Sequence, residues 1–127
     1  MAVTTSPHLA ALTGQRLTNV LLGHAVSLRF TGGDEVLIEG AARLDGHRIR
    51  PGDDSADALV AVLGDVVREV GTGAGGELRI SFGSGARLVV DADADAESWA
   101  IAGADGRLIV CLANGELAVW DQPGTRP

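Results

Sequence analysis

The chain has 127 residues, of which 46% are hydrophobic, and a formal net charge of −7. Its length suits one domain, and its hydrophobic content excludes a disordered chain. The negative charge argues against a nucleic-acid partner, and no apolar run approaches the roughly 20 residues of a membrane-spanning helix.

The remaining composition indicates a cytoplasmic protein from a GC-rich bacterium. The first residues lack the charged and long apolar regions of a secretory signal. All ten basic residues are arginine, and alanine, glycine, valine and aspartate are abundant. A single cysteine, Cys111, excludes an intrachain disulfide and a cysteine-based metal cluster, and we expect no cofactor.

Three short strands are predicted at the start of the domain, over residues 14–22, 25–30 and 35–38. A two-residue turn beginning at Gly23 joins the first two, since glycine adopts the positive φ of that position. A three-residue loop with a bulge is predicted between the second and third. This loop places Phe30 opposite Val36, and it places Leu28 opposite Ile38. All four side chains then share one face.

One helix is predicted near the middle of the chain, after a segment at residues 40–54 that is irregular apart from a short strand near Leu44 or Ile49. The residues suited to cap its start are Asp53, Asp54 and Ser55. Its apolar stripe consists of Leu59, Val62 and Leu63. Gly64 is expected to end it.

The segment after this helix repeats the first strand unit. Gly14–Val20 is similar to Gly64–Val70, Val26–Phe30 to Leu78–Phe82, and Val36–Glu39 to Leu88–Asp91. The same loop is expected to place Phe82 opposite Leu88. We interpret the repeat as an internal duplication of a three-strand meander. Because one copy alone has a single apolar face, the two copies are expected to share a core.

Residues 97–120 are predicted to form a closing meander of three strands. Asp105-Gly106 and Asn114-Gly115 are typical of two-residue type I′ turns. That register assigns one face to the core: Trp99, Ile101, Leu108, Val110, Leu112, Leu117 and Val119. The opposite face then carries an apolar shelf: Ile109, Cys111, Ala118 and Trp120.

This apolar shelf is the candidate interface. A solvated antiparallel face should be polar, so another group is expected to cover the shelf. The cover is either an element of the same chain or a second subunit or partner protein. Cys111 is expected to be an inert buried thiol, because no base or helix N-terminus adjoins it in the sequence.

A second set of candidate residues would form a small-ligand site at the mouth of a barrel. Its residues would be Arg43, His47 and Glu97, which are polar and lie outside the predicted core strands. The run Gly71–Gly76 contains G-x-G-x-x-G, but no helix is predicted after it. A dinucleotide site needs that helix, so we interpret the run as a flexible hairpin loop.

A divalent-cation site is the third candidate. Asp91, Asp93 and Asp95 place acids at every second position, so in an extended segment they would share one side. Carboxylate oxygens grouped in this way suit Ca²⁺. The EF-hand pattern is not met, and a solvated acidic connector is the better interpretation.

The most distinctive stretches of the sequence are Glu97-Ser98-Trp99 and the block Gly115–Trp120. Together with the repeated G-x-x-V/L strand and the L-x-F-x-x-G-x-x-L hairpin, they resemble a family of small uncharacterised proteins from GC-rich bacteria, a domain of unknown function. The resemblance covers residues 14–120 and implies one compact β-rich domain. It implies no activity, cofactor or catalytic residue.

These patterns predict a single α+β domain over residues 14–120, with flexible termini at 1–13 and 121–127. About eight or nine strands in antiparallel meanders, with one helix, form a sandwich or partly open barrel. We expect a non-catalytic protein-binding module that self-associates or binds a basic protein, as toxin-neutralising immunity proteins do. A ligand-binding or enzymatic barrel and a divalent-cation-binding module are the alternatives.

Overall fold

The computed structural model describes residues 7–120, and the rest of the predicted flexible termini lies outside this range. Its strands are β1 (Leu17–Leu22), β2 (Val26–Phe30), β3 (Glu35–Ile38), β4 (Ala42–Leu44), β5 (His47–Ile49), β6 (Val67–Thr72), β7 (Leu78–Phe82), β8 (Arg87–Val90), β9 (Trp99–Ala102), β10 (Leu108–Cys111) and β11 (Leu117–Trp120). Its helices are α1 (Pro7–Ala10) and the 3₁₀ helices η1 (Asp54–Val62) and η2 (Ala113–Gly115). The predicted fold of antiparallel meanders with little helix is confirmed, with more strands than expected.

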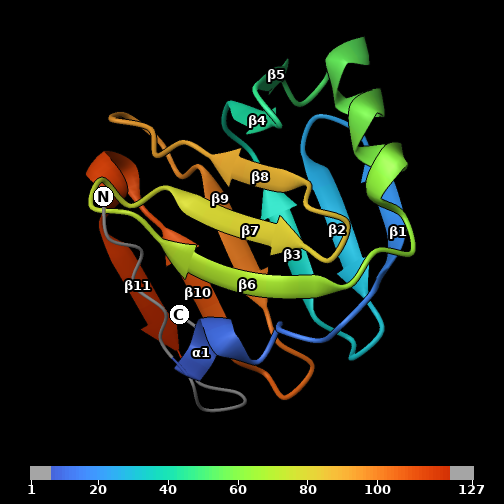
Figure 1. The fold of residues 1–127 in the computed structure, drawn as a ribbon. Coiled ribbons are helices and arrows are strands. Elements are labelled where there is room, and N and C mark those ends of the chain that lie inside the picture. Colours follow the sequence, from blue (N-terminus) through green and yellow to red (C-terminus); the bar gives the residue numbers. More distant parts are fainter. Residues whose placement is uncertain (1–6, 121–127) are drawn as a thin grey trace.

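The strands form two antiparallel sheets that face each other (Figure 1). The six-stranded sheet has the order β1-β2-β3-β9-β10-β11, and the five-stranded sheet has the order β5-β4-β8-β7-β6. Both sheets are open, so the architecture is a sandwich and not a closed barrel. The first and last meanders therefore share one sheet, and the middle of the chain builds the other.

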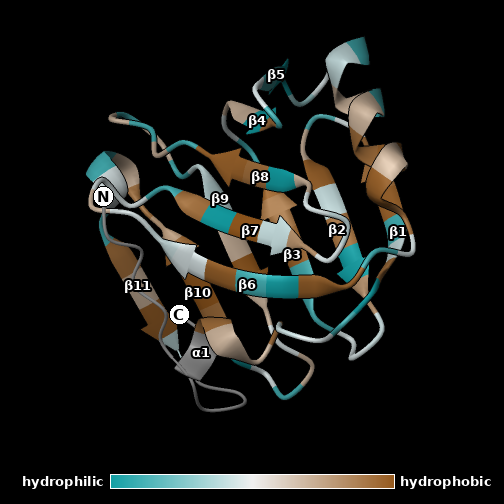
Figure 2. Cartoon of the chain, viewed as in Figure 1, coloured by the Kyte–Doolittle hydropathy of each residue, from teal (hydrophilic) through white to brown (hydrophobic). Residues whose placement is uncertain are grey.

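Large apolar side chains from both sheets fill the space between them. The bulkiest fully buried residues of the strands include Trp99, Phe82, Leu28, Ile38, Leu78, Ile80 and Leu88. Figure 2 shows hydrophobic and more hydrophilic residues alternating along β7. Such alternation is expected of a strand that has one face on the core and one face in water.

The first meander has the predicted faces but a different register. Leu28 lies opposite Val36, which is two residues away from the predicted pairing. The loop between β2 and β3 has the predicted three residues, but this length pairs Phe30 with Asp34 and not with Val36. Gly33 closes the loop with a φ of +88°. A shift of two residues leaves every side chain on its face, so Phe30 and Ile38 still reach the core.

The meander β6-β7-β8 repeats the geometry of β1-β2-β3. Val67 lies opposite Phe82 in the way that Leu17 lies opposite Phe30. In both copies the register shifts immediately after this pair. The hairpin register of the second copy is also two residues from the prediction and again keeps the predicted faces.

Reciprocal backbone hydrogen bonds join the two copies where their first strands begin. The Gly14 N–H donates to the Val67 carbonyl at 2.8 Å. The equivalent Gly64 N–H donates to the Leu17 carbonyl, also at 2.8 Å. An antiparallel bridge between Arg16 and its equivalent residue lies between these bonds. The junction therefore has local two-fold symmetry, in which each copy supplies the same donor and the same acceptor.

The helix η1 has a different buried face from the one predicted. Its buried residues recur at every third position: Ala56, Leu59 and Val62. Leu63, which was predicted to be buried, is 43% exposed. A 3₁₀ helix has three residues per turn, so its apolar face follows a period of three. Asp53 caps its start by accepting a hydrogen bond from the Ser55 N–H at 2.8 Å.

Two segments are more regular than the sequence predicted. Residues 7–13, expected to be flexible, contain α1 and bury Leu9 and Leu12. The segment expected to be largely irregular forms the β4–β5 hairpin around Asp45-Gly46. Both residues of this turn have positive φ, as a type I′ turn requires.

The closing meander has three-residue loops where two-residue turns were predicted. The pairing is shifted by one residue, so that Trp99 lies opposite Cys111. A one-residue shift turns a strand over and exchanges its two faces. Ile109 and Cys111 therefore point into the core, and Leu108, which was predicted to be in the core, points outward.

Asp34 is a buried carboxylate that holds three segments of the chain together. It accepts hydrogen bonds from the Gln15 side chain and from the Ala104 N–H, each at 3.0 Å. The Arg107 guanidinium lies 3.5 Å from the same carboxylate. The Asp34 carboxylate therefore connects the loop after β2, the loop after β9 and the segment that precedes β1.

We expect Asp34→Ala to lower the free energy of unfolding by about 2–4 kcal/mol, because charge-assisted hydrogen bonds are lost and the Ala104 N–H loses its acceptor. Urea unfolding followed by circular dichroism measures the change. Asp93→Ala is the control, because Asp93 is an exposed residue whose carboxylate accepts from the Asp95 N–H. Equal losses in the two variants would contradict the assigned role of Asp34.

Candidate functional site

The candidate site is the outer face of the six-stranded sheet, which is the face turned away from the core. Strand pairing places one row of residues across its middle: Leu21, Ser27, Leu37, Ala100, Val110 and Ala118. The neighbouring row consists of Asn19, Arg29, Glu35, Ala102, Leu108 and Trp120. The first row contains no charged residue. In the second, Arg29 and Glu35 form an ion pair at 3.5 Å.

The outer face of the five-stranded sheet has the opposite character. Its middle row consists of Arg48, Arg43, Val89, Arg79 and Gly71. Arg43 donates to Asp91 at 2.9 Å. Arg79 donates to Glu77 at 2.8 Å. Guanidinium groups with ion-pair partners suit a face in contact with water, whereas leucine, valine and tryptophan do not.

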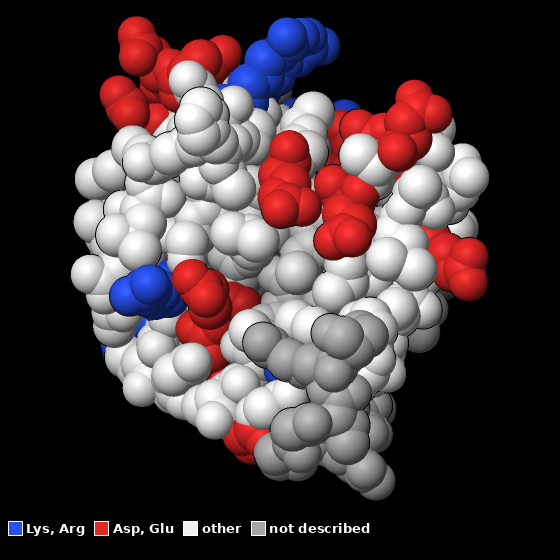
Figure 3. All heavy atoms as spheres, turned by 180° about the vertical axis from the view of Figure 1, so that it is seen from behind, with Lys and Arg blue, Asp and Glu red and all other residues white. Residues whose placement is uncertain are grey.

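Figure 3 shows the outer face of the six-stranded sheet. Acidic residues, with one basic group among them, gather in the upper part of this face, and a basic group lies beside acidic groups at mid-height on its left side. The strand directions place five exposed acids at this end of the sheet: Glu39, Asp93, Asp95, Glu97 and Glu116. The candidate site is therefore an apolar surface with an acidic rim at one end.

The structure divides the predicted apolar shelf between the two faces of the sheet. Ala118 and Trp120 lie on the outer face and are half-buried. Ile109 and Cys111 lie on the inner face and are buried, because of the one-residue shift in register. The neighbours of Ala118 and Trp120 are instead two residues that were assigned to the core: Val110 and Leu108.

The prediction also missed two residues of the outer face, Leu21 and Leu37. Leu37 stands between Val36 and Ile38 in β3, and both of these are buried. Because side chains alternate along a strand, two core residues that flank a leucine place that leucine on the opposite face. This alternation is the signal that identifies Leu37 from the sequence.

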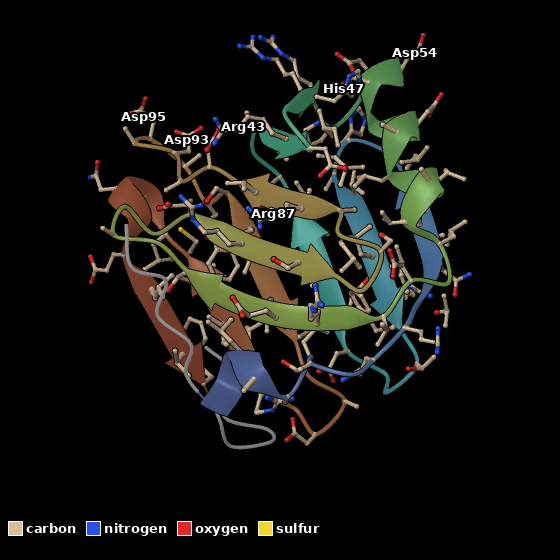
Figure 4. All side chains as sticks on the ribbon, in the orientation of Figure 1. Arg43, His47, Asp54, Arg87, Asp93 and Asp95 are labelled. Atoms are coloured by element: carbon tan, nitrogen blue, oxygen red, sulfur yellow. The ribbon has the colours of Figure 1, made fainter. Side chains whose placement is uncertain are left out.

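The structure does not bring the ligand candidates Arg43, His47 and Glu97 together, and Figure 4 shows Arg43 and His47 pointing apart. Arg43 lies on the outer face of β4, whereas His47 is paired with the buried Leu44 and points to the other face of the hairpin. Glu97 is exposed just before β9, in the other sheet. A depression beside Arg43 is lined by a different set of residues: Asp45, Gly46, Arg87 and Val89.

The acidic run that begins at Asp91 bends and does not extend. Asp93 accepts a hydrogen bond from the Asp95 N–H at 2.8 Å. Asp91 is bonded to Arg43, as described above. Within residues 7–120, no group of three or more His, Cys, Asp or Glu side chains is placed to hold a metal ion. Figure 4 shows Asp93 and Asp95 on the loop that leads into β9.

The glycine-rich run Gly71–Gly76, expected to be a flexible loop, is held in place by the core. The Gly76 carbonyl accepts a hydrogen bond from the Trp99 indole Nε1 at 3.0 Å, and it lies 3.5 Å from the Cys111 Sγ. A Cβ atom at Gly76 would lie 2.4 Å from the Gly115 carbonyl oxygen. Glycine is therefore required for the close packing of two loops, which accounts for the run without a nucleotide.

Four surface carboxyl groups have a pKa below the ordinary value, each chiefly because of a side-chain hydrogen bond. These carboxyl groups, with the donors that lower each pKa, are Asp53 with Ser55, Asp65 with Ser84, Glu77 with Arg79, and Asp105 with Arg107. A lowered pKa keeps the carboxylate ionised, whereas a general acid at neutral pH needs a raised pKa. These groups accept hydrogen bonds that hold caps and turns, and their lowered pKa argues against a general-acid role.

Residues 8–121 match the sequence pattern of a family of unknown function, and this range is most of the chain. The chain belongs to the family DUF6188. No curated protein and no solved structure matches it. The DUF6188 range includes every strand of both sheets and all of α1 except its first residue. In the part of the chain that the structure describes, no helix has the length and apolar character needed to cross a membrane.

Proposed function

We propose that this DUF6188 protein is a non-catalytic protein-binding module of the bacterial cytoplasm. Its binding surface is the outer face of the six-stranded sheet. The observation that carries the proposal is the contrast between the two outer faces of one sandwich. The face of the five-stranded sheet has arginines with ion-pair partners along its middle row, whereas the middle row of the other face carries no charge across six strands. The Arg29–Glu35 ion pair lies in the row beside it.

The acidic rim indicates the chemistry of the partner. Glu39 and Glu116 are exposed at one end of the apolar surface, and the chain carries a net charge of −7. The guanidinium of Arg29 is already paired with Glu35. A partner with an apolar contact area and basic side chains at its border would be attracted to this surface and would bury it. A basic toxin fits this description of the partner, and this chain would then act as the immunity-type protein that neutralises it.

Substitutions at Leu37 test the proposal, because Leu37 lies in the uncharged row of the outer face. Proteins from the native cell are captured on the wild-type chain and on Leu37→Arg. A protein retained only by the wild type is then purified, and its dissociation constant is measured for each variant. We expect Leu37→Arg to weaken binding roughly tenfold or more and Leu37→Glu to weaken it less, because a basic partner repels arginine.

Val89→Arg is the matched control, since Val89 occupies the middle of the other outer face. It is expected to change the dissociation constant less than about twofold. Binding should also weaken as salt rises. The proposal fails if no protein is retained selectively, or if Leu37→Arg and Val89→Arg behave alike. A larger loss with Leu37→Glu than with Leu37→Arg would show that the partner is not basic.

Self-association is the second candidate function, and one strand favours it. β11 contains no charged residue and lies at the end of the six-stranded sheet. The ligand-binding and cation-binding alternatives have less support. The open sandwich has a core filled by side chains, and the described acids do not converge.

A further inference from the structure

The edges of the two sheets are protected unequally. η1 packs against β1 and β5, which are one edge of each sheet. α1 packs against β6, the other edge of the five-stranded sheet, and β6 also carries the charged residues Arg68 and Glu69. Helices and charges of this kind prevent an edge strand from pairing with another chain.

β11 is the remaining edge, and its sequence has neither a charge nor a proline. Within residues 7–120 its strand partner is β10 alone. The six-stranded sheet is one strand wider than the five-stranded sheet, and the inward-facing side chains of β11 are incompletely covered. Leu117 is 38% exposed and Val119 is 45% exposed. Figure 2 shows that β11 lacks hydrophilic residues.

The hydrogen bonds of the hairpin determine which backbone groups of β11 bond to β10 and which point away from it. The Leu112 N–H donates to the Glu116 carbonyl at 2.7 Å. Antiparallel strands alternate between residues that bond to a neighbour and residues that bond to the other side. Ala118 and Trp120 therefore bond to β10. The N–H and C=O groups of Leu117 and Val119 point to the open edge.

We propose that β11 pairs antiparallel with β11 of a second copy of this chain. Centred on Ala118, the pairing places Leu117 opposite Val119 of the second copy, and the two residues exchange both of their backbone hydrogen bonds. The same exchange occurs on the other side of the two-fold axis. The interface is isologous, because the same strand serves on both sides.

The side chains of β11 agree with this register. Leu117 and Val119 bring apolar groups together on the inner side of the strand. On the outer side, Glu116 lies opposite Trp120 of the second copy, so no like charges face each other. The two six-stranded sheets become continuous, and their apolar outer faces lie side by side. This inference goes beyond the proposed partner-binding function and does not depend on it.

Val119→Pro is the test, because proline removes the outward N–H and leaves the bonds to β10 in place. Analytical ultracentrifugation of the full chain across a concentration series gives the dissociation constant of the dimer. We expect the wild type to dimerise. Val119→Pro should raise the dissociation constant of the dimer roughly 30-fold, because the substitution is present in both copies and therefore removes two hydrogen bonds. Val119→Ala is the matched control, because it shortens the side chain and retains the N–H.

Hydrogen exchange of the wild type gives an independent readout. The amides of Leu117 and Val119 should become protected as the protein concentration rises, whereas the Ala118 amide is protected at every concentration. This result stands even if Val119→Pro fails to fold. The inference is overturned if the wild type stays monomeric, or if these two amides exchange at a rate independent of concentration.

The outer-face variant separates this inference from the proposed function. Leu37 is remote from β11 in the strand order, so Leu37→Arg should leave the dimer intact. Pairing through β11 would be refuted if Leu37→Arg dissociated the dimer and Val119→Pro did not. Partner binding by the outer face is measured with the captured protein and is judged separately.

Discussion

Replacing Trp99 with alanine is expected to lower the free energy of unfolding by about 3–5 kcal/mol. Trp99 is completely buried between the sheets. Its indole N–H also donates to the Gly76 carbonyl, so truncation creates a cavity and removes a buried hydrogen bond. A domain of this size has a total stability of about 5–15 kcal/mol, so the variant loses a large fraction of it. Urea unfolding followed by circular dichroism measures the loss.

Trp120→Ala is the natural control, since the chain has two tryptophans and Trp120 lies half-buried on the outer face. We expect it to cost less than about 1.5 kcal/mol. Trp99→Phe should fall between the two alanine variants, because it retains an aromatic ring and loses the hydrogen bond. Similar losses for Trp99→Ala and Trp120→Ala would contradict the assignment of Trp99 to the centre of the core.

The second large effect is expected at the contact between the two glycine loops. A Cβ atom at Gly115 would lie 2.1 Å from the Gly75 carbonyl oxygen, and Gly115 has a φ of +80°. Gly115→Ala must therefore separate the η2 loop from the loop between β6 and β7, as well as accept a strained backbone. We expect a loss of about 2–4 kcal/mol, measured by the same unfolding experiment.

Gly46→Ala separates the clash from the backbone strain. Gly46 has a similar φ of +83°, but a Cβ atom there would meet no atom within 4 Å. Its cost should be about 1–2 kcal/mol, which is the strain of a left-handed residue alone. If Gly46→Ala and Gly115→Ala cost the same, the loop contact contributes nothing, and the glycine-rich run needs another explanation.

The core of both repeated meanders was predictable even though their registers were not. Leu28 and Ile80 each lie two residues from the predicted pairing, and a strand has a side-chain period of two. The apolar alternation in the sequence fixes the face of each residue. It does not fix the position of the strand along its neighbour, which depends on the geometry of the loop.

The closing meander shows the limit of the same argument. Asp105-Gly106 and Asn114-Gly115 suit a two-residue type I′ turn, and they equally suit a three-residue loop that ends on a left-handed glycine. The structure has the longer loop at both places, and the odd shift exchanges the faces of β10. At Asp45-Gly46, the same type of dipeptide forms the two-residue turn. Local sequence does not distinguish these outcomes, because β10 is apolar at every position and either of its faces packs favourably against the core.

The apolar outer face was partly predictable for a related reason. β10 has apolar residues at every position, so an unpaired apolar face was expected in either register. The residues that form this face were not predicted correctly. Leu108 and Val110 exchange places with Ile109 and Cys111 when the strand turns over. The buried Asp34 was missed altogether. Its partners Gln15, Ala104 and Arg107 come together only through the pairing of β3 with β9.

The order of strands in the six-stranded sheet has a consequence for biosynthesis. β3 has β9 as its second neighbour, so one edge of β3 cannot form its backbone hydrogen bonds until residues 99–102 have left the ribosome. Until then the nascent first meander exposes an apolar face and an unpaired strand, both of which favour contacts between unfinished chains. The first meander is therefore expected to complete its sheet only after β9 has been synthesised, and chains that stall or are truncated before β9 should be strong substrates for chaperones.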